Sequence, residues 1–333
     1  MKRQIVQDEF FDKQPPLSFV EYLKAPVHTA RPARFSRTAA EEGEVSVRGI
    51  YLDHRFPDPD GLLDTVTADF SLFISLCGIG GGRFPVRLQK GITSCFEEYI
   101  IDISAEGCII TAADTEGIRR ALIYLEDEMI AREGAFLPLG RIRRKPWMSR
   151  RITRGFFSPT NRPPKNGDEL SDTIDYYPDE YLNRLMHDGT NGLWIYTSFK
   201  QLVPSDIITE YGVGHEKRVE KLNRVIEKCA RYGIGVYVFA IEPAGIAEEL
   251  GDKYADMIGQ KCGGLSITPC VRIPSARRRI AMRRAAVCSR SAPVLPGLSA
   301  LRQVSGRPPA PPRRVASARA VRICPAARCL PPM

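Results

Sequence analysis

Acidic and aromatic residues are missing from the last 77 residues of the chain. Residues 257–333 contain no Asp, Glu, Phe, Tyr or Trp, but they hold 14 Arg, 11 Pro and 12 Ala. The whole chain has a net charge of +9, yet 15 of its 48 Lys and Arg lie in this segment and all 39 acidic residues precede it, so residues 1–256 carry a net charge of −6. A segment that has no aromatic side chains and no periodic pattern of apolar residues cannot form a packed core. We therefore predict that residues 257–333 form a disordered basic tail.

The composition of this tail favours an out-of-frame translation. Arg, Ala, Pro and Gly have GC-rich codons, and a shifted reading of a GC-rich gene yields such a mixture. Arginine clusters such as 277–284 attract phosphates, so a basic arm that binds nucleic acid is one alternative. Aromatic side chains that could stack on bases are absent, which argues against that arm. A folded domain is the third alternative. We predict that a frame shifted near codons 259–270 restores a sequence with acidic and aromatic residues.

Long apolar runs are also missing. No uninterrupted run approaches the roughly 18 apolar residues that a membrane span requires. At the amino end, Asp8 and Glu9 stand where the apolar core of a secretion signal would lie. The expected location is therefore the cytoplasm, with no membrane partner.

Local metal and nucleotide motifs are absent as well. The four cysteines before residue 257 form no C-x-x-C pair, and the four histidines form no H-E-x-x-H pattern, so we expect neither a metal nor a cofactor. The run 78–82 is glycine-rich, but the strand-like segment 84–88 follows it instead of a helix. A phosphate-binding loop needs a helix there, so this run predicts a turn.

Residues 1–44 are expected to be irregular, because four prolines interrupt any long element. Residues 45–140 predict a small α+β domain. We expect strands at 47–52, 67–73, 84–88, 98–103 and 108–111, the last two forming a hairpin around the turn at 105–107. A helix from Asp114 or Thr115 to about Ala131 carries apolar residues at helical spacing. One sheet covered by this helix is therefore expected.

Residues 147–256 alternate strand and helix, which predicts parallel βα units. We expect strands at 152–157, 193–197 and 234–241, and helices that begin near 177–180 and run over about 215–232. Gly233 ends the second helix, and the strand after it is apolar throughout, as a strand buried on both faces must be. Three units fit before the composition changes, and a sheet of three strands keeps an open edge.

Polar side chains stand where these three strands end. Arg154 lies in the first strand, Tyr196 closes the second, and Glu242 directly follows the third. Binding groups of parallel βα barrels lie at the carboxyl ends of strands, and consecutive strands are neighbours. We therefore expect these three residues to share one cavity rim. A solvated loop carboxylate is the alternative interpretation of Glu242.

Segments 99–129, 145–151 and 177–185 follow one another in a characteristic order. Their sequences and order resemble family 20 glycoside hydrolases, the β-N-acetylhexosaminidases and their relatives, over about residues 45–250. The resemblance implies a zincin-like α+β domain of the family 20 type, followed by a (β/α)8 TIM barrel. In the family an arginine near the first barrel strand holds sugar hydroxyls, and Arg151 or Arg154 corresponds to it.

The third strand is similar to the family's E-x-D-x-P-G-H segment. Glu242 stands at the Asp position and Gly245 at the Gly position, but Ile246 replaces the His. In the family the 2-acetamido oxygen attacks the anomeric carbon, an Asp orients that group, and a Glu acts as the general acid. Both acids follow the fourth strand, which here falls after Asp256, where no carboxylate occurs.

The resemblance thus implies a truncated, inactive protein descended from a hydrolase of β-N-acetylhexosaminides. A carbohydrate is the expected ligand, and no catalytic residue is assigned. The alternatives are a non-catalytic carbohydrate-binding protein and a nucleic-acid binder that uses its basic tail.

Overall fold

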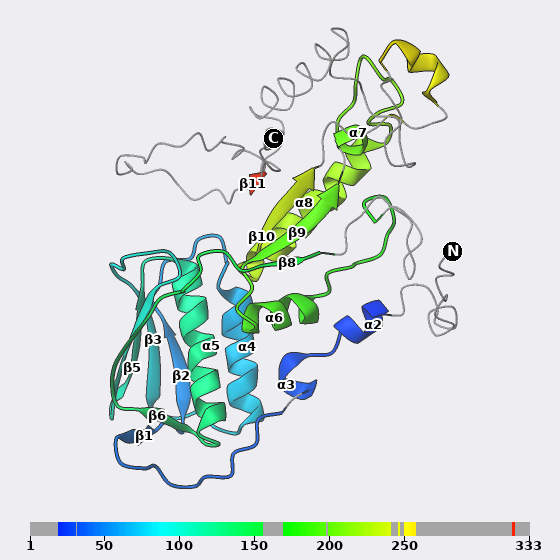
Figure 1. The fold of residues 1–333 in the computed structure, drawn as a ribbon. Coiled ribbons are helices and arrows are strands. Elements are labelled where there is room, and N and C mark those ends of the chain that lie inside the picture. Colours follow the sequence, from blue (N-terminus) through cyan, green and yellow to red (C-terminus); the bar gives the residue numbers. More distant parts are fainter. Residues whose placement is uncertain are drawn as a thin grey trace, which may run out of the picture.

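The computed structural model describes residues 19–30, 32–155, 169–197, 199–240, 246, 250–257 and 322–323. The fold is mixed α/β with three sheets (Figure 1). An α+β unit comes first in the chain, and a unit of parallel strands and helices follows it. Within the described ranges, no helix combines the length and apolar character that crossing a membrane would take.

A five-stranded sheet forms the outer layer of the α+β unit. Its strand order is β2 (Ile50–His54), β3 (Phe84–Lys90), β5 (Gly107–Ala112), β4 (Tyr99–Ser104) and β7 (Gly140–Arg144). The predicted hairpin is confirmed, because β4 and β5 pair antiparallel with Ser104 opposite Gly107. The expectation of a single sheet is wrong, since β1 (Glu44–Ser46) and β6 (Phe136–Pro138) pair in a separate two-stranded sheet.

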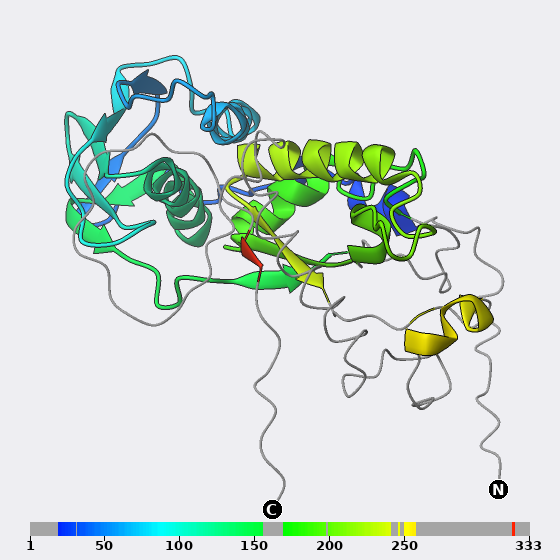
Figure 2. The same cartoon turned by 90° about the horizontal axis from the view of Figure 1, so that it is seen from above.

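Helices α4 (Asp64–Leu76) and α5 (Thr115–Ala131) lie side by side on one face of the five-stranded sheet (Figures 1 and 2). The prediction of α5 is confirmed, including its first residue: the Asp114 side chain accepts a hydrogen bond from the Gly117 amide at 2.8 Å. The α5 residues that face inward are completely buried, among them Ile118, Leu122, Leu125 and Met129.

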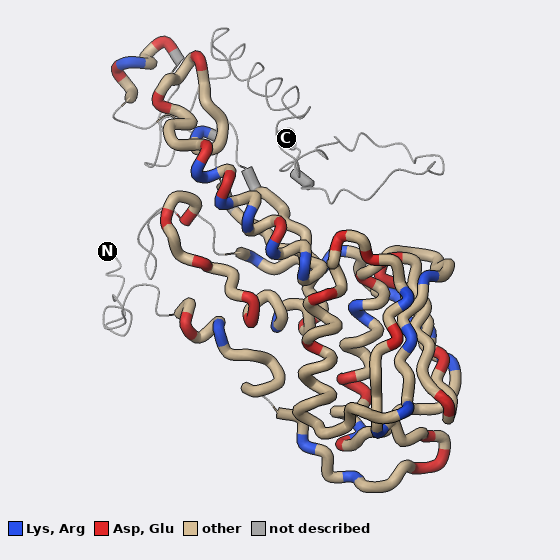
Figure 3. Tube along the Cα trace, turned by 180° about the vertical axis from the view of Figure 1, so that it is seen from behind, with Lys and Arg blue, Asp and Glu red and all other residues tan. Residues whose placement is uncertain are grey.

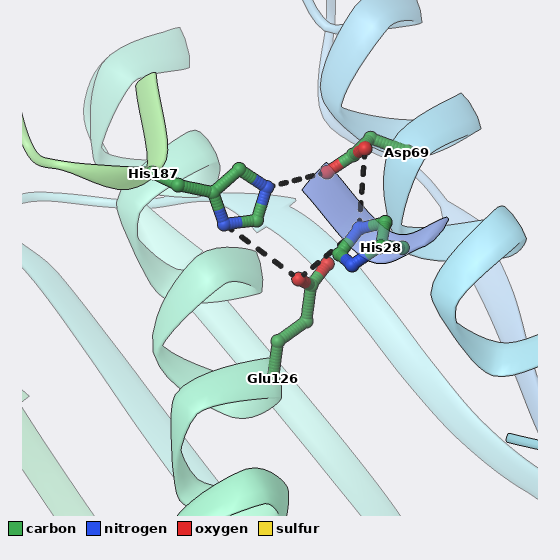
Figure 4. Close-up of side chains that lie close together, drawn as sticks. All are labelled: His28, Asp69, Glu126 and His187. Atoms are coloured by element: carbon green, nitrogen blue, oxygen red, sulfur yellow. Dashed lines mark hydrogen bonds and ion pairs between the residues drawn. The ribbon is translucent and has the colours of Figure 1, made fainter. Parts of the chain in front are cut away.

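The predicted strand at 67–73 is wrong, because these residues lie within α4. The buried residues of this helix include Val66, Phe70, Phe73 and Ile74, which recur at helical spacing. In a segment of only seven residues, the apolar pattern of a helix can look like the alternating pattern of a strand. The segment 67–73 was therefore too short to distinguish a helix from a strand. Asp69 of the same helix is buried and lies next to His28 of α3 and His187 of α6 (Figure 4).

The glycine-rich run at 78–82 follows a helix, as a turn that leads into β3. Gly78 and Gly81 adopt left-handed φ angles of 65° and 76°. The predicted turn is therefore confirmed, and the arrangement of strand, glycine loop and helix that binds dinucleotides is not formed here.

Two short helices occur in the segment expected to be irregular. They are α2 (Phe19–Leu23) and α3 (Val27–Ala30), and Pro26 stands directly before α3. A proline at the start of a helix removes only an amide that has no partner within the helix, so the prolines here separate helices instead of preventing them. α3 places the side chain of His28 in a buried position.

The second unit confirms the predicted parallel βα arrangement. Its sheet has the order β11 (Arg322–Ile323), β10 (Gly235–Ala240), β9 (Gly192–Thr197) and β8 (Ile152–Arg154), and all pairs are parallel. The helices are α6 (Asp179–His187), α7 (Phe199–Leu202) and α8 (His215–Arg231). The short 3-10 helix η2 spans Asp252–Met257. Two residues of the predicted tail thus form a strand, and the other residues from 258 to 333 lie outside the described part.

Helix α8 lies across one face of this sheet (Figure 2). It buries Leu222, Val225 and Cys229, and its other positions carry charges of both signs along its length (Figure 3). Gly233 follows the helix with a left-handed φ of 72°, as predicted. A Cβ atom at this glycine would lie 2.7 Å from Nε of Arg119, so the turn must be glycine to fit against α5.

Two arginines of α5 join the units. Arg119 is fully buried and binds Glu116 at 3.1 Å and the Thr65 hydroxyl at 3.2 Å within the α+β unit. It also reaches Sδ of Met186 in α6 at 3.3 Å, which is its contact with the second unit. Arg120 donates hydrogen bonds to the carbonyls of Met186 and Thr190, at 2.6 and 3.1 Å. These carbonyls lie at the carboxyl end of α6, where a cation interacts well with the helix dipole.

Candidate functional site

The carboxyl end of β8 places Arg154 beside two aromatic residues. The register pairs Arg154 with Trp194 of β9, and Trp194 with Tyr237 of β10. The Arg154 guanidinium carbon lies 5.6 Å from the centroid of the Trp194 ring, within the range of a cation–π contact. Their neighbours Leu193 and Ile195 are fully buried on the other face. A row of Arg154, Trp194 and Tyr237 therefore lies on the sheet face that points away from the buried apolar core.

The other residues expected at this rim are only partly described. Tyr196 is the fifth residue of β9, and its Cα pairs with that of Phe239 in β10. Glu242 and Gly245 lie outside the described residues, so the shared rim stays a prediction. Ile246, which stands in place of the family's histidine, is buried in a small apolar cluster with Ile208, Tyr211 and Tyr254.

Arg151 lies at the amino end of β8 and points to the α+β unit. Its guanidinium binds the Glu97 carboxylate at 2.6 Å and the carbonyl oxygens of Gly189 and Met148 at 2.5 and 2.7 Å. Glu97 is only 1 % exposed, and it also accepts a hydrogen bond from the Asn191 side chain at 3.2 Å. Arg151 therefore holds the two units together, whereas Arg154 is exposed at the opposite end of the strand.

A second constellation joins four helices that are distant in sequence (Figure 4). His28 of α3, Asp69 of α4, Glu126 of α5 and His187 of α6 each offer one ligand atom, and these atoms lie within 4.8 Å of one another. Sequence reasoning missed this cluster, because it searched for histidines at local spacing. A polar residue inside the apolar face of a predicted helix, such as Glu126, was the signal that could have pointed to it.

The geometry of the cluster is compact. Nε2 of His187 lies 2.7 Å from Oδ2 of Asp69, and Nε2 of His28 lies 3.2 Å from Oδ1 of the same carboxylate. Oε2 of Glu126 lies 3.6 Å from Nε2 of His28 and 3.9 Å from Nδ1 of His187. Asn183 donates a further hydrogen bond to Asp69 at 2.7 Å. The two imidazoles thus stand between the two carboxylates.

The two carboxyl groups differ in their electrostatics. Burial on its own raises the pKa of Asp69, but the hydrogen bond from His187 and the neighbouring His28 outweigh it, so the pKa lies below its usual value. Burial, with the nearby Asp69 carboxylate, raises the pKa of Glu126 well above its usual value. Both Glu126 oxygens and Nε2 of His28 are buried without a hydrogen-bond partner. A buried polar atom without a hydrogen bond is costly, so these three atoms are suited to a ligand that would satisfy them.

An acidic cleft adjoins the cluster. Its volume is about 710 Å³, and His28 and Asp69 are part of its lining. Five acidic residues and a single arginine line it: Asp60, Asp64, Asp69, Asp179, Glu180 and Arg231. The negative charge of this cleft attracts cations.

No family model matches the chain, and no curated protein matches it. Among solved structures, a family 138 enzyme that targets pectin rhamnogalacturonan II is similar at 14% identity and a TM-score of 0.48, covering 64% of this chain and 27% of the other. The β-N-acetylhexosaminidase from Bacteroides fragilis NCTC 9343 is similar at 17% identity and a TM-score of 0.44, covering 78% and 54%.

The family 20 β-N-acetylhexosaminidase from Streptomyces coelicolor A3(2) is similar at 15% identity and a TM-score of 0.44, covering 72% of this chain and 53% of the other. This chain therefore spans between about a quarter and about half of the length of these structures. Likenesses at this level of identity and TM-score do not assign the chain to a family.

Proposed function

We propose that this chain is a relative of the family 20 glycoside hydrolases and binds a carbohydrate on the face of β8, β9 and β10 that carries Arg154, Trp194 and Tyr237, with the carboxyl ends of these strands as its rim. The sequence resemblance over about residues 45–250 supports the relationship. The observation that carries the proposal is the row of Arg154, Trp194 and Tyr237, which presents a cation and two aromatic rings on the open face of a parallel sheet. Aromatic faces and arginine donors are suited to the apolar faces and the hydroxyls of a sugar.

In this proposal Arg154 holds sugar hydroxyls, and Tyr196 and Glu242 complete the rim. Arg151 is the weaker candidate for the same role, because Glu97 and two carbonyls already occupy its donors. The two units represent the family's N-terminal domain and the first part of an incomplete (β/α)8 barrel. Hydrolysis is not expected, because residues 257–333 contain no carboxylate to serve as the general acid or to orient the acetamido group.

The test is to measure binding and turnover with the full chain. We expect N-acetylglucosamine or its β-linked disaccharide to perturb the fluorescence of Trp194, with no release of the aryl group from an aryl N-acetylglucosaminide. Arg154→Ala should weaken binding about tenfold or more, as the loss of a hydrogen bond from a charged group does. Arg48→Ala, an exposed arginine of the other unit, is the matched control and should leave binding unchanged.

Two results would refute the proposal. Equal affinities of the Arg154→Ala and Arg48→Ala variants would remove the sugar site from the end of β8. Turnover by the full chain would show that the catalytic acids lie before residue 257, and the correspondence with the family's acid pair would then be wrong. A non-catalytic carbohydrate-binding protein is the second candidate. It differs in one outcome, because a frame-restored chain would then bind the sugar without hydrolysing it, whereas a restored hydrolase would release the aryl group.

A further inference from the structure

The cluster of His28, Asp69, Glu126 and His187 is independent of the strand ends and has the composition of a metal site. We propose that these four side chains bind one divalent transition-metal ion of the zinc class. The ion would link α3, α4, α5 and α6, and so fasten the short helix α3 and the βα unit to the α+β unit. The sugar-binding proposal neither requires this site nor predicts it.

The donor set fits such an ion. Imidazole nitrogens and carboxylate oxygens are both common ligands of zinc, at about 2.0–2.2 Å from the metal. Four donors at that distance on a tetrahedron stand about 3.3 Å from one another. Nε2 of His28 lies 3.2 Å from Asp69 and 3.6 Å from Glu126, which is close to this separation. Only small side-chain shifts would complete the coordination.

Burial and missing partners distinguish this cluster from an ordinary hydrogen-bond network. The Glu126 side chain is 1 % exposed and that of His28 is 8 % exposed, yet both Glu126 oxygens and Nε2 of His28 have no hydrogen-bond partner. Nε2 of His28 has the carboxylates of Asp69 and Glu126 at 3.2 and 3.6 Å, but no hydrogen bond forms, so the desolvation of these atoms is only partly compensated. A cation between them would satisfy all three atoms at once.

The surroundings supply orientation and access. Asn183 donates to Oδ1 of Asp69 at 2.7 Å, in the position of the outer hydrogen bond that usually orients a metal-binding carboxylate. The acidic cleft reaches His28 and Asp69 and offers a path for entry. With four protein donors and little exposure, the site has the closed form that is typical of structural ions, in contrast to catalytic sites, which keep an open position.

The experiment uses the full chain after removal of metals with a chelator. Zn²⁺ is added in competition with a chromophoric chelator, and one tight equivalent is expected to depend on the cluster. Glu126→Gln should weaken it about a hundredfold, since even outer-shell changes cost 10- to 100-fold. This variant is expected to fold, because a neutral amide replaces a buried carboxyl group that makes no hydrogen bond. Asp127→Asn, which alters the exposed neighbour on α5, should bind as the unaltered chain does.

A second pair of variants and a second measurement separate this site from others. His28→Gln should lose the ion, whereas His54→Gln, which alters an exposed histidine of the α+β unit, should keep it. Zn²⁺ should slow hydrogen exchange in residues 27–30 of the unaltered chain but not in Glu126→Gln. The cobalt form should absorb as a tetrahedral complex of nitrogen and oxygen donors, without the charge-transfer band of a thiolate.

Three results of these experiments would contradict the metal site. Equal Zn²⁺ affinity of the Glu126→Gln and Asp127→Asn variants would place any bound ion elsewhere, and a thiolate band would assign it to cysteines. Absence of tight binding to the unaltered chain, with Glu126→Gln equally stable, would show that Glu126 is simply protonated. Each of these results would overturn the proposal, while sugar binding would remain unaffected.

Discussion

Replacing Glu97 tests how the two units are joined. This carboxylate is 1 % exposed, binds Arg151 at 2.6 Å and Asn191 at 3.2 Å, and lies 3.6 Å from Nε of Arg120. Removing one partner of a buried ion pair costs about 3–5 kcal/mol, because the remaining charges are left buried without compensation. Since a whole domain is typically stable by about 5–15 kcal/mol, we expect Glu97→Ala to lose about a fifth or more of that stability.

The backbone of Glu97 allows a sharper comparison. Its φ angle is 64°, in the left-handed region that favours glycine. A glycine there relieves about 1–2 kcal/mol of backbone strain. The greater freedom of glycine in the unfolded chain offsets about 0.5–1 kcal/mol of this gain. Glu97→Gly should therefore be more stable than Glu97→Ala by about 0.5–1 kcal/mol, although both lose the same carboxylate.

The assay is urea unfolding followed by tryptophan fluorescence. The two tryptophans both lie in the second unit, and Trp147 is 99 % exposed, so the unfolding signal comes from Trp194. Glu106→Ala changes an exposed turn residue and should shift stability by less than about 0.5 kcal/mol. If Glu97→Ala stays within about 1 kcal/mol of the unaltered chain, or proves more stable than Glu97→Gly, the account of this joint is wrong.

Further predictions concern a glycine and the thiols. Gly233→Ala should destabilise the chain by more than about 2 kcal/mol, because it combines a positive φ with a clash against α5. Gly43→Ala, which has a φ of 81° and open space around it, should cost only about 1–2 kcal/mol; equal losses in thermal unfolding would argue against the clash. Burial raises the pKa of Cys108 and of Cys229 to about 12, whereas Cys95 is exposed. Peptide mapping after alkylation at pH 8 should therefore find Cys95 modified and the other two unreacted in the folded chain, and early modification of Cys108 would contradict its burial.

The sequence predicted those elements whose signals are local. Asp114 marked the start of α5, Gly233 marked the end of α8, and the apolar strand before residue 241 indicated a parallel sheet. The segment 67–73 was predicted to be a strand, because a short apolar run fits the period of a strand as well as that of a helix. In the structure this segment lies within α4, which packs against the sheet.

The two candidate sites differ in how much of each could be predicted from the sequence. The sequence predicted Arg154 because side chains at the ends of neighbouring parallel strands gather at one edge of a sheet. The structure pairs Arg154 with Trp194, and its role in binding stays a prediction. The His28 cluster was not found, because its four members come from four helices and meet only through tertiary packing. Arg151 was assigned by resemblance to the same region as Arg154, but three residues along a strand separate the two ends of β8. The contacts of Arg151 with Glu97 and of Arg154 with Trp194 distinguish the two arginines, and both depend on tertiary packing.

The row of Arg154, Trp194 and Tyr237 has a consequence for how this sheet tolerates insertions and deletions. Each strand contributes one side chain to the row, so the row widens by about 4.8 Å with every strand that joins the edge. Deleting one residue within β9 would turn Leu193 or Ile195 to the open face and bury the indole of Trp194, because side chains alternate along a strand. Length changes are therefore tolerated in the loops that enter and leave these strands, whereas a change of one residue inside a strand inverts its contribution to the surface.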